Sequence, residues 1–104
     1  MLVMEWAAAT KREVLTAIEE DWVGIDTDLR KRLSVYLIDP QHALIDRFGL
    51  TENAFIVARI GSHVVFFDDI EKDFGTAEES EGRLQNTASY GNIALALKEL
   101  ERLS

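Results

Sequence analysis

The sequence predicts an α+β fold in a single domain over residues 1–104. An apolar stripe at helical spacing runs through residues 4–22, and a second occupies residues 93–103. Between them, two runs rich in β-branched and aromatic residues, 54–60 and 63–70, are separated only by Gly61 and Ser62. We therefore expect N-terminal helices, an antiparallel meander of three to five strands with a central hairpin at 54–70, and a C-terminal helix packed on the sheet.

The first third of the chain has helical periodicity. Its stripe consists of Ala7, Ala8, Val14, Leu15, Ile18 and Trp22. Gly24 is expected to stop this helix, and Asp26 or Thr27 to cap a second one. The second helix would carry Leu29, Leu33, Tyr36 and Leu37 and end at Pro40, although residues 33–38 also fit a strand.

Residues 39–49 fit two structures. Asp39 as a cap, Pro40 at the first helical position and Gly49 after the end would suit a short helix. The alternation of residue types also suits a strand, and we favour a strand from about Ala43 to Phe48.

The hairpin is the strongest structural prediction. A two-residue turn at Gly61-Ser62 suits type II′ and fixes the register. The expected pairs are Ile60 with His63, Ala58 with Val65, Ile56 with Phe67, and Phe55 with Asp68. Both faces of this hairpin are mainly apolar, so both need a cover: helices on one side, and a helix, a loop or a second molecule on the other.

The rest of the chain completes the sheet and the last helix. A third strand is expected over 72–77, a turn over 78–82 and a short return strand over 83–87. Ser89 is expected to cap the final helix, whose stripe is Ile93, Ala96, Leu97, Leu100 and Leu103.

Negative charge is concentrated between Asp68 and Glu81. Seven of these fourteen residues are acidic and one is basic, so the segment carries −6 of the net −8 of the chain. Such a cluster attracts basic partners at long range. We predict that this segment forms a partner-binding face whose contact residues are Asp68, Asp69, Glu71, Asp73, Phe74, Glu78 and Glu79. Phe74, Trp22 and Tyr90 are the candidate apolar anchors.

The alternating acids Asp69, Glu71 and Asp73 resemble the start of an EF-hand loop, but the pattern then fails. Phe74 stands where that loop needs glycine, and Ser80 stands where it needs a bidentate glutamate. We expect no metal and no cofactor, with a loose divalent-cation site as the alternative. Adjacent acids on a strand point to opposite faces, and the scattered serines and histidines form no recognisable triad, so we expect no catalysis.

The amino-acid composition argues against several kinds of site, location and partner. The chain has no cysteine, which removes disulfides and thiolate metal sites. The segment beginning at Met1 has no basic region, and its apolar run is broken at Glu5, so no secretory signal or membrane span is expected and the cytoplasm is the expected location. A pI near 4.6 argues against nucleic acid as a partner.

The hairpin and its flanks resemble a known group. Over residues 43 to about 100, the shared string is Arg47-Phe48-Gly49, Glu52, Phe55-Ile56-Val57-Ala58, Gly61, Val64 to Glu71, Phe74 and Gly82-Arg83-Leu84. This pattern is similar to small bacterial immunity proteins of polymorphic and contact-dependent growth-inhibition toxin systems. The resemblance implies a binding role in which the chain neutralises a cognate toxin, for example a nuclease, and it transfers no site residues. The alternative is a homodimeric structural or adaptor domain, motivated by the two-sided apolar hairpin.

Overall fold

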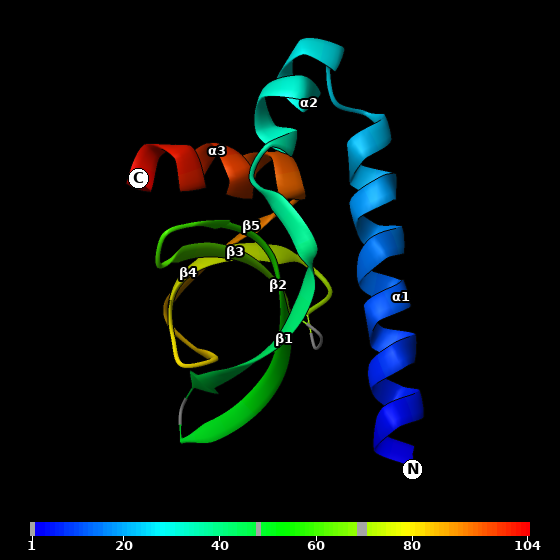
Figure 1. Cartoon of the computed structure of the whole chain (residues 1–104), viewed down its shortest axis with the longest axis vertical. Helices are drawn as coiled ribbons and strands as arrows, with labels where there is room; N and C mark the ends of the chain where they lie inside the picture. The colour runs from blue at the N-terminus through cyan, green and yellow to red at the C-terminus, as the bar shows by residue number, and fades with distance from the viewer. Residues whose placement is uncertain (1, 48, 69–70) are drawn as a thin grey trace.

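The computed structural model describes the backbone of residues 2–47, 49–68 and 71–104, and the side chains from Lys11 onward within those ranges except Arg47. Two helices come first, five strands follow, and one helix ends the chain (Figure 1). Their bounds are α1 Leu2–Val23, α2 Thr27–Ser34, β1 Leu37–Arg47, β2 Leu50–Ile60, β3 His63–Asp68, β4 Phe74–Ser80, β5 Arg83–Gly91 and α3 Ile93–Leu103.

The five strands form an antiparallel meander that closes into a barrel, seen nearly end-on in Figure 1. Closure comes from a short parallel pairing of β1 with β5, in which Leu44 lies opposite Arg83 and Ile45 opposite Leu84. Irregular register at several points along the sheet accompanies the tight curvature. The α+β prediction is confirmed, and the barrel closure adds to it.

Two separate cores result from the curvature. The interior of the barrel is filled by the buried side chains of Ala43, Ile45, Ala54, Ile56, Val64, Phe66, Ala77 and Leu84. A second core lies between the outside of the barrel and the helices, and contains Val14, Leu33, Phe55, Val57, Ala58, Val65, Phe67, Phe74, Ile93, Ala96, Leu97 and Leu100. The second apolar face of the hairpin is therefore covered by the sheet itself.

The hairpin turn forms as predicted, but the register slips beyond it. Gly61 adopts a φ of +61°, as the first central position of a type II′ turn requires. Ile60 pairs with His63 and Ala58 with Val65, as expected. A bulge at Val57 then places Ile56 opposite Phe66 and moves the partner of Asp68 from Phe55 to Ala54.

Several element boundaries differ from the predictions. Asp26 does cap α2, accepting hydrogen bonds from the backbone N–H groups of Asp28 and Leu29, but that helix ends at Ser34 rather than at Pro40. Pro40 lies inside β1, where the register is irregular, so the helical alternative for 39–49 is wrong. The expected end of this strand at Phe48 falls outside the described residues.

The end of the chain shows a similar extension. The strand β5 runs on to Gly91, so the predicted cap Ser89 lies in a strand. Asn92 caps α3 instead, and its side chain accepts a hydrogen bond from the backbone N–H of Leu95 at 3.0 Å. Ile93, Ala96, Leu97 and Leu100 are buried as predicted, whereas Leu103 at the last turn is exposed.

Candidate functional site

The acidic segment predicted as one face is divided between the two ends of β4. Asp68, Glu71 and Asp73 belong to the bend before this strand, whereas Glu78 and Glu81 lie at its far end. A strand of seven residues spans roughly 20 Å. A charge cluster that is compact in the sequence therefore becomes two separate groups of carboxylates in the fold.

The bend between β3 and β4 is shaped by Asp68. Its Oδ1 accepts a hydrogen bond from the backbone N–H of Glu71 at 3.2 Å, and its carbonyl oxygen accepts one from the backbone N–H of Lys72 at 2.8 Å. Its own N–H donates to the carbonyl of Asp73 at 2.9 Å. Asp68 is only 3% exposed, so its role in the bend is structural and its predicted contact with a partner conflicts with its burial. Asp69 lies outside the described residues.

Three carboxylates gather at this bend. Oxygen atoms of Asp68, Glu71 and Asp73 all lie within 4.8 Å of one another, and Asp73 also accepts a hydrogen bond from the hydroxyl of Ser89 at 2.8 Å. Carboxylate oxygens are the ligands that Ca²⁺ and Mg²⁺ prefer, so these are the side chains that could hold a cation. With or without a cation, the bend holds three acidic groups close together.

The candidate aromatic anchors are largely enclosed. Phe74 is 2% exposed and packs against Phe67, with ring centroids 5.1 Å apart. Its predicted contact with a partner conflicts with this burial, since its ring already fills the core beneath the helices. Trp22 and Tyr90 are half-buried against the same core.

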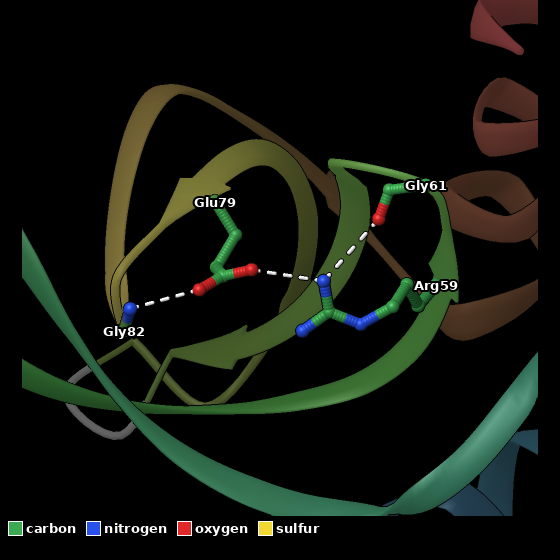
Figure 2. A network of polar contacts seen from close by, with 4 residues as sticks. All are labelled: Arg59, Gly61, Glu79 and Gly82. Atoms are coloured by element: carbon green, nitrogen blue, oxygen red, sulfur yellow. Dashed lines mark hydrogen bonds and ion pairs between the residues drawn. The ribbon is translucent and has the colours of Figure 1, made fainter.

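At the far end of β4, both carboxylate oxygens of Glu79 accept hydrogen bonds from within the chain (Figure 2). One carboxylate oxygen accepts a hydrogen bond from Arg59 Nη1 at 2.8 Å, and the other accepts one from the backbone N–H of Gly82 at 2.8 Å. The bond from Arg59 and then that from Gly82 lower the pKa of Glu79 below its ordinary value. Glu78 accepts a hydrogen bond from the side-chain amide of Asn86. Of these two predicted contact residues, only Glu78 is exposed.

Sequence reasoning missed a second acidic segment, residues 19–28. It contains Glu19, Glu20, Asp21, Asp26 and Asp28 and no basic residue. Two of these acids cap helices: Asp26 caps α2, and Asp21 accepts a hydrogen bond from the backbone N–H of Ile93 at the start of α3, at 3.0 Å. A count of acids and bases along the whole chain would have found this segment.

Two open grooves run along α1. The first, of about 530 Å³, lies between this helix and the bend before β4, and is lined by Arg12, Glu13, Thr16, Ala17, Glu20, Phe67 and Lys72. The second, of about 480 Å³, lies where the end of α1 meets the starts of α2 and α3, and its lining includes Asp21 and Asp26. Glu20 lines both grooves, so one continuous surface extends from Lys72 at the bend to the second acidic segment.

The charges of this surface are only partly neutralised. Lys72 Nζ lies 2.8 Å from a carboxylate oxygen of Glu13 and ties α1 to the bend. Neither Glu20 nor Glu71 forms an ion pair or hydrogen bond through its carboxylate with any other residue that the structure describes. The lining of the first groove has two acidic and two basic side chains, and that of the second has three acidic ones and no base. The two grooves together are therefore a net acidic surface with part of its lining apolar, and we take this surface along α1 as the candidate functional site.

Comparison of the chain with protein-family models, with curated proteins and with solved structures finds no significant match in any of the three. Among the described residues, no helix combines the length and the apolar character needed to cross a membrane.

Proposed function

We propose that this protein is a non-catalytic inhibitor that docks on a basic partner protein through the acidic surface along α1. The observation that carries the proposal is the continuity of that surface, from Lys72 at the bend through Glu20 to the start of α2. The sequence resemblance to bacterial toxin-immunity proteins supplies the class of partner: a toxin domain, for example a nuclease, whose basic substrate groove would be occluded.

The charge distribution suits rapid encounter with such a partner. The net charge is −8, and the linings of the two grooves together contain four acidic side chains, Glu13, Glu20, Asp21 and Asp26, against two basic ones, Arg12 and Lys72. Complementary potentials raise association rates from about 10⁶ M⁻¹s⁻¹ toward 10⁸–10⁹ M⁻¹s⁻¹ at low salt. An inhibitor that must act before its target causes damage benefits from this increase.

The observation that motivated the homodimer alternative is explained by the fold of a single chain. The second apolar face of the hairpin needed a cover, and its side chains now lie inside the barrel, with Val64 and Phe66 both buried. A second molecule is therefore not required to cover this face.

The product of the reading frame next to the gene of this protein is the partner to test. Co-expression should protect cells from that product, and association kinetics should slow as salt concentration rises. Replacing Glu20 and Glu71 together by Gln should slow association roughly tenfold at low salt, because Glu20 lines both grooves and Glu71 is an exposed acid beside Lys72 on the bend.

The matched control removes the same charge from the far end of β4, with Glu78→Gln and Glu81→Gln together. Both of those side chains are exposed. This control should leave the association rate within about twofold of the wild type. Equal slowing by the two double variants would count against docking along α1, and no protection in the co-expression experiment would overturn the proposed function.

A further inference from the structure

We propose that a cavity between α3 and the outer face of the barrel binds a small organic cation, a protonated amine that carries a hydroxyl group at its other end. Among the described residues, this cavity shares none of its lining with the two grooves along α1. The site is therefore separate from the proposed docking surface and adds a small ligand to the binding partners of the chain.

The cavity lies between the last turns of α3 and the strands β3, β4 and β5. Figure 1 shows α3 lying across these strands. The volume of the cavity is about 220 Å³, roughly seven times the share of one molecule in liquid water. A small organic molecule fits this space, whereas a drug-sized ligand needs more. The lining includes His63, Thr76, Glu78, Ala88, Glu99 and Leu103.

Thr76 contributes a buried hydroxyl group to the cavity wall. It pairs across the sheet with Val65, a residue of the core between the barrel and the helices, so it belongs to the outer face. The residue is only 4% exposed, and its hydroxyl makes no hydrogen bond with any residue that the structure describes. Buried polar groups are nearly always hydrogen-bonded. The cavity is the place from which water or a ligand group would supply the missing partner.

The charge at the cavity selects a cation. Glu78 follows Thr76 by two residues on β4, so both belong to the same face. Its carboxylate accepts a hydrogen bond from the neutral amide of Asn86 and forms no ion pair within the described part of the chain. The second carboxylate of the lining, Glu99, is paired with Arg102. No Lys or Arg is among the described lining residues, so the charge of Glu78 is left for a cationic ligand.

The positions of Thr76 and Glu78 set the length of the ligand. Residues two apart on a strand are separated by roughly 7 Å. An ammonium group and a hydroxyl group joined by a butane chain span a similar length. Ala88, which lies opposite Thr76 on β5, and Leu103 on α3 supply exposed apolar surface for the carbon chain. The ligand class is therefore a short amino alcohol, with its ammonium at Glu78 and its hydroxyl at Thr76.

The probe is 4-aminobutan-1-ol, titrated into the full chain at constant ionic strength and at about pH 8, where histidine is ordinarily neutral. By NMR we expect saturable amide shifts at Thr76, Glu78 and Ala88, with the millimolar Kd expected of so small a ligand. Pentan-1-ol carries a methyl group in place of the ammonium, and 5-hydroxypentanoate carries a carboxylate there. Each should bind at least roughly tenfold more weakly.

Two substitutions test the charge. Glu78→Gln keeps an acceptor for Asn86 but removes the carboxylate charge, so it should weaken binding of 4-aminobutan-1-ol at least roughly tenfold. Glu81→Gln removes an exposed charge from the turn after β4, outside the described lining of the cavity. It should leave binding within about twofold of the wild type.

A third substitution tests the hydroxyl contact. Thr76→Val replaces the hydroxyl by a methyl group of similar size, and it should weaken binding of 4-aminobutan-1-ol by about threefold or more. Pentylamine lacks the hydroxyl of the probe, so Thr76→Val should leave its binding within about twofold of the wild type. Thermal unfolding of all three variants checks that each remains folded.

Four results would overturn the proposal. The first is the absence of saturable shifts with 4-aminobutan-1-ol, which would leave only water as the occupant of the cavity. The others are equal binding of 4-aminobutan-1-ol and pentan-1-ol, equal effects of Glu78→Gln and Glu81→Gln, and equal weakening of both amines by Thr76→Val. Each of these results leaves docking along α1 untouched, and failure of docking leaves the cavity proposal untouched.

Discussion

Arg59 and Glu79 join two strands that are not neighbours in the sheet, since β3 lies between β2 and β4 (Figure 2). Arg59 pairs across the sheet with Val64, and Glu79 with Leu84, and both of those partners belong to the core inside the barrel. Because opposite residues on antiparallel strands share a face, this ion pair lies on the inner face near one end of the barrel. Arg59 Nη1 also donates to the carbonyl of Gly61, so the same contact holds the hairpin turn.

The pair should therefore stabilise the barrel measurably. Its side chains are 32% and 17% exposed, which makes it better shielded than most surface ion pairs. Arg59→Met and Glu79→Gln should each lower the free energy of unfolding by about 1–2 kcal/mol. A double-mutant cycle by urea unfolding should give a coupling energy of about 1 kcal/mol.

The control cycle uses Arg83 and Asp46, which join β5 to β1 at 2.7 Å but are more exposed. Their coupling should be smaller, since water screens them. Equal coupling in the two cycles would contradict the role assigned to the inner pair.

Stability should fall in acid partly through Glu79. Its pKa lies below the ordinary value of 4.5, chiefly because of the hydrogen bond from Arg59. The folded state therefore favours the ionised form, and this contribution is complete above the ordinary pKa and is lost as the pH falls through the lowered one. The pKa of Asp46 is lowered by Arg83, and that of Glu99 by Arg102, so both act in the same direction.

Urea unfolding of the wild type and of Glu79→Gln at several pH values tests this assignment. The wild type should be more stable at neutral pH, and the difference should shrink as the pH falls below the ordinary pKa of 4.5 and through the lowered pKa of Glu79. A difference that stays constant with pH would show that the charge of Glu79 does not contribute.

The hairpin shows which features of the fold can be predicted from the local sequence. The turn at Gly61 and the first pairs of the register follow from loop length and residue type. The bulge at Val57 does not, because a strand that is apolar on both sides gives no alternation from which an inserted residue can be detected. Pro40 led to the wrong prediction that the second helix ends there. Proline usually marks the end of a helix or strand, yet an irregular position in β1 accommodates it.

Barrel closure and the candidate site depend on contacts between distant segments. The parallel pairing of Leu44 with Arg83 has no local signature, since it follows from the curvature of the whole sheet. The acidic character of the site could be predicted near Glu71, but the contribution of Glu20 depends on where α1 packs. Burial of Asp68 and Phe74 follows in the same way from the fold around the bend.

Gly75 should tolerate no side chain, although its backbone φ is ordinary. A Cβ atom there would collide with the carbonyl oxygen of Ala88 on β5 and would lie 3.1 Å from the ring of Phe66. Gly75→Ala should lower the free energy of unfolding by about 2 kcal/mol or more, because β4 and β5 would have to separate. Gly24→Ala is the control, since nothing lies within 4 Å of its added atom. Similar melting temperatures for the two variants would contradict the close approach of Gly75 to Ala88 on β5.

Asp21 should act as a helix cap supplied from a different helix. Its carboxylate on α1 accepts the hydrogen bond from the backbone N–H of Ile93, at the first turn of α3. Asp21→Ala should lower the free energy of unfolding by about 1 kcal/mol, which shifts the melting temperature by roughly 4–8 °C in a domain of this size. Hydrogen exchange at Ile93 should also become faster.

Two variants serve as controls. Asp21→Asn keeps an acceptor oxygen, so its free energy of unfolding should fall by less than that of Asp21→Ala. Asp28→Ala, at an exposed position on α2, should leave hydrogen exchange at Ile93 unchanged. Unchanged exchange at Ile93 in Asp21→Ala would show that α3 does not depend on this cap.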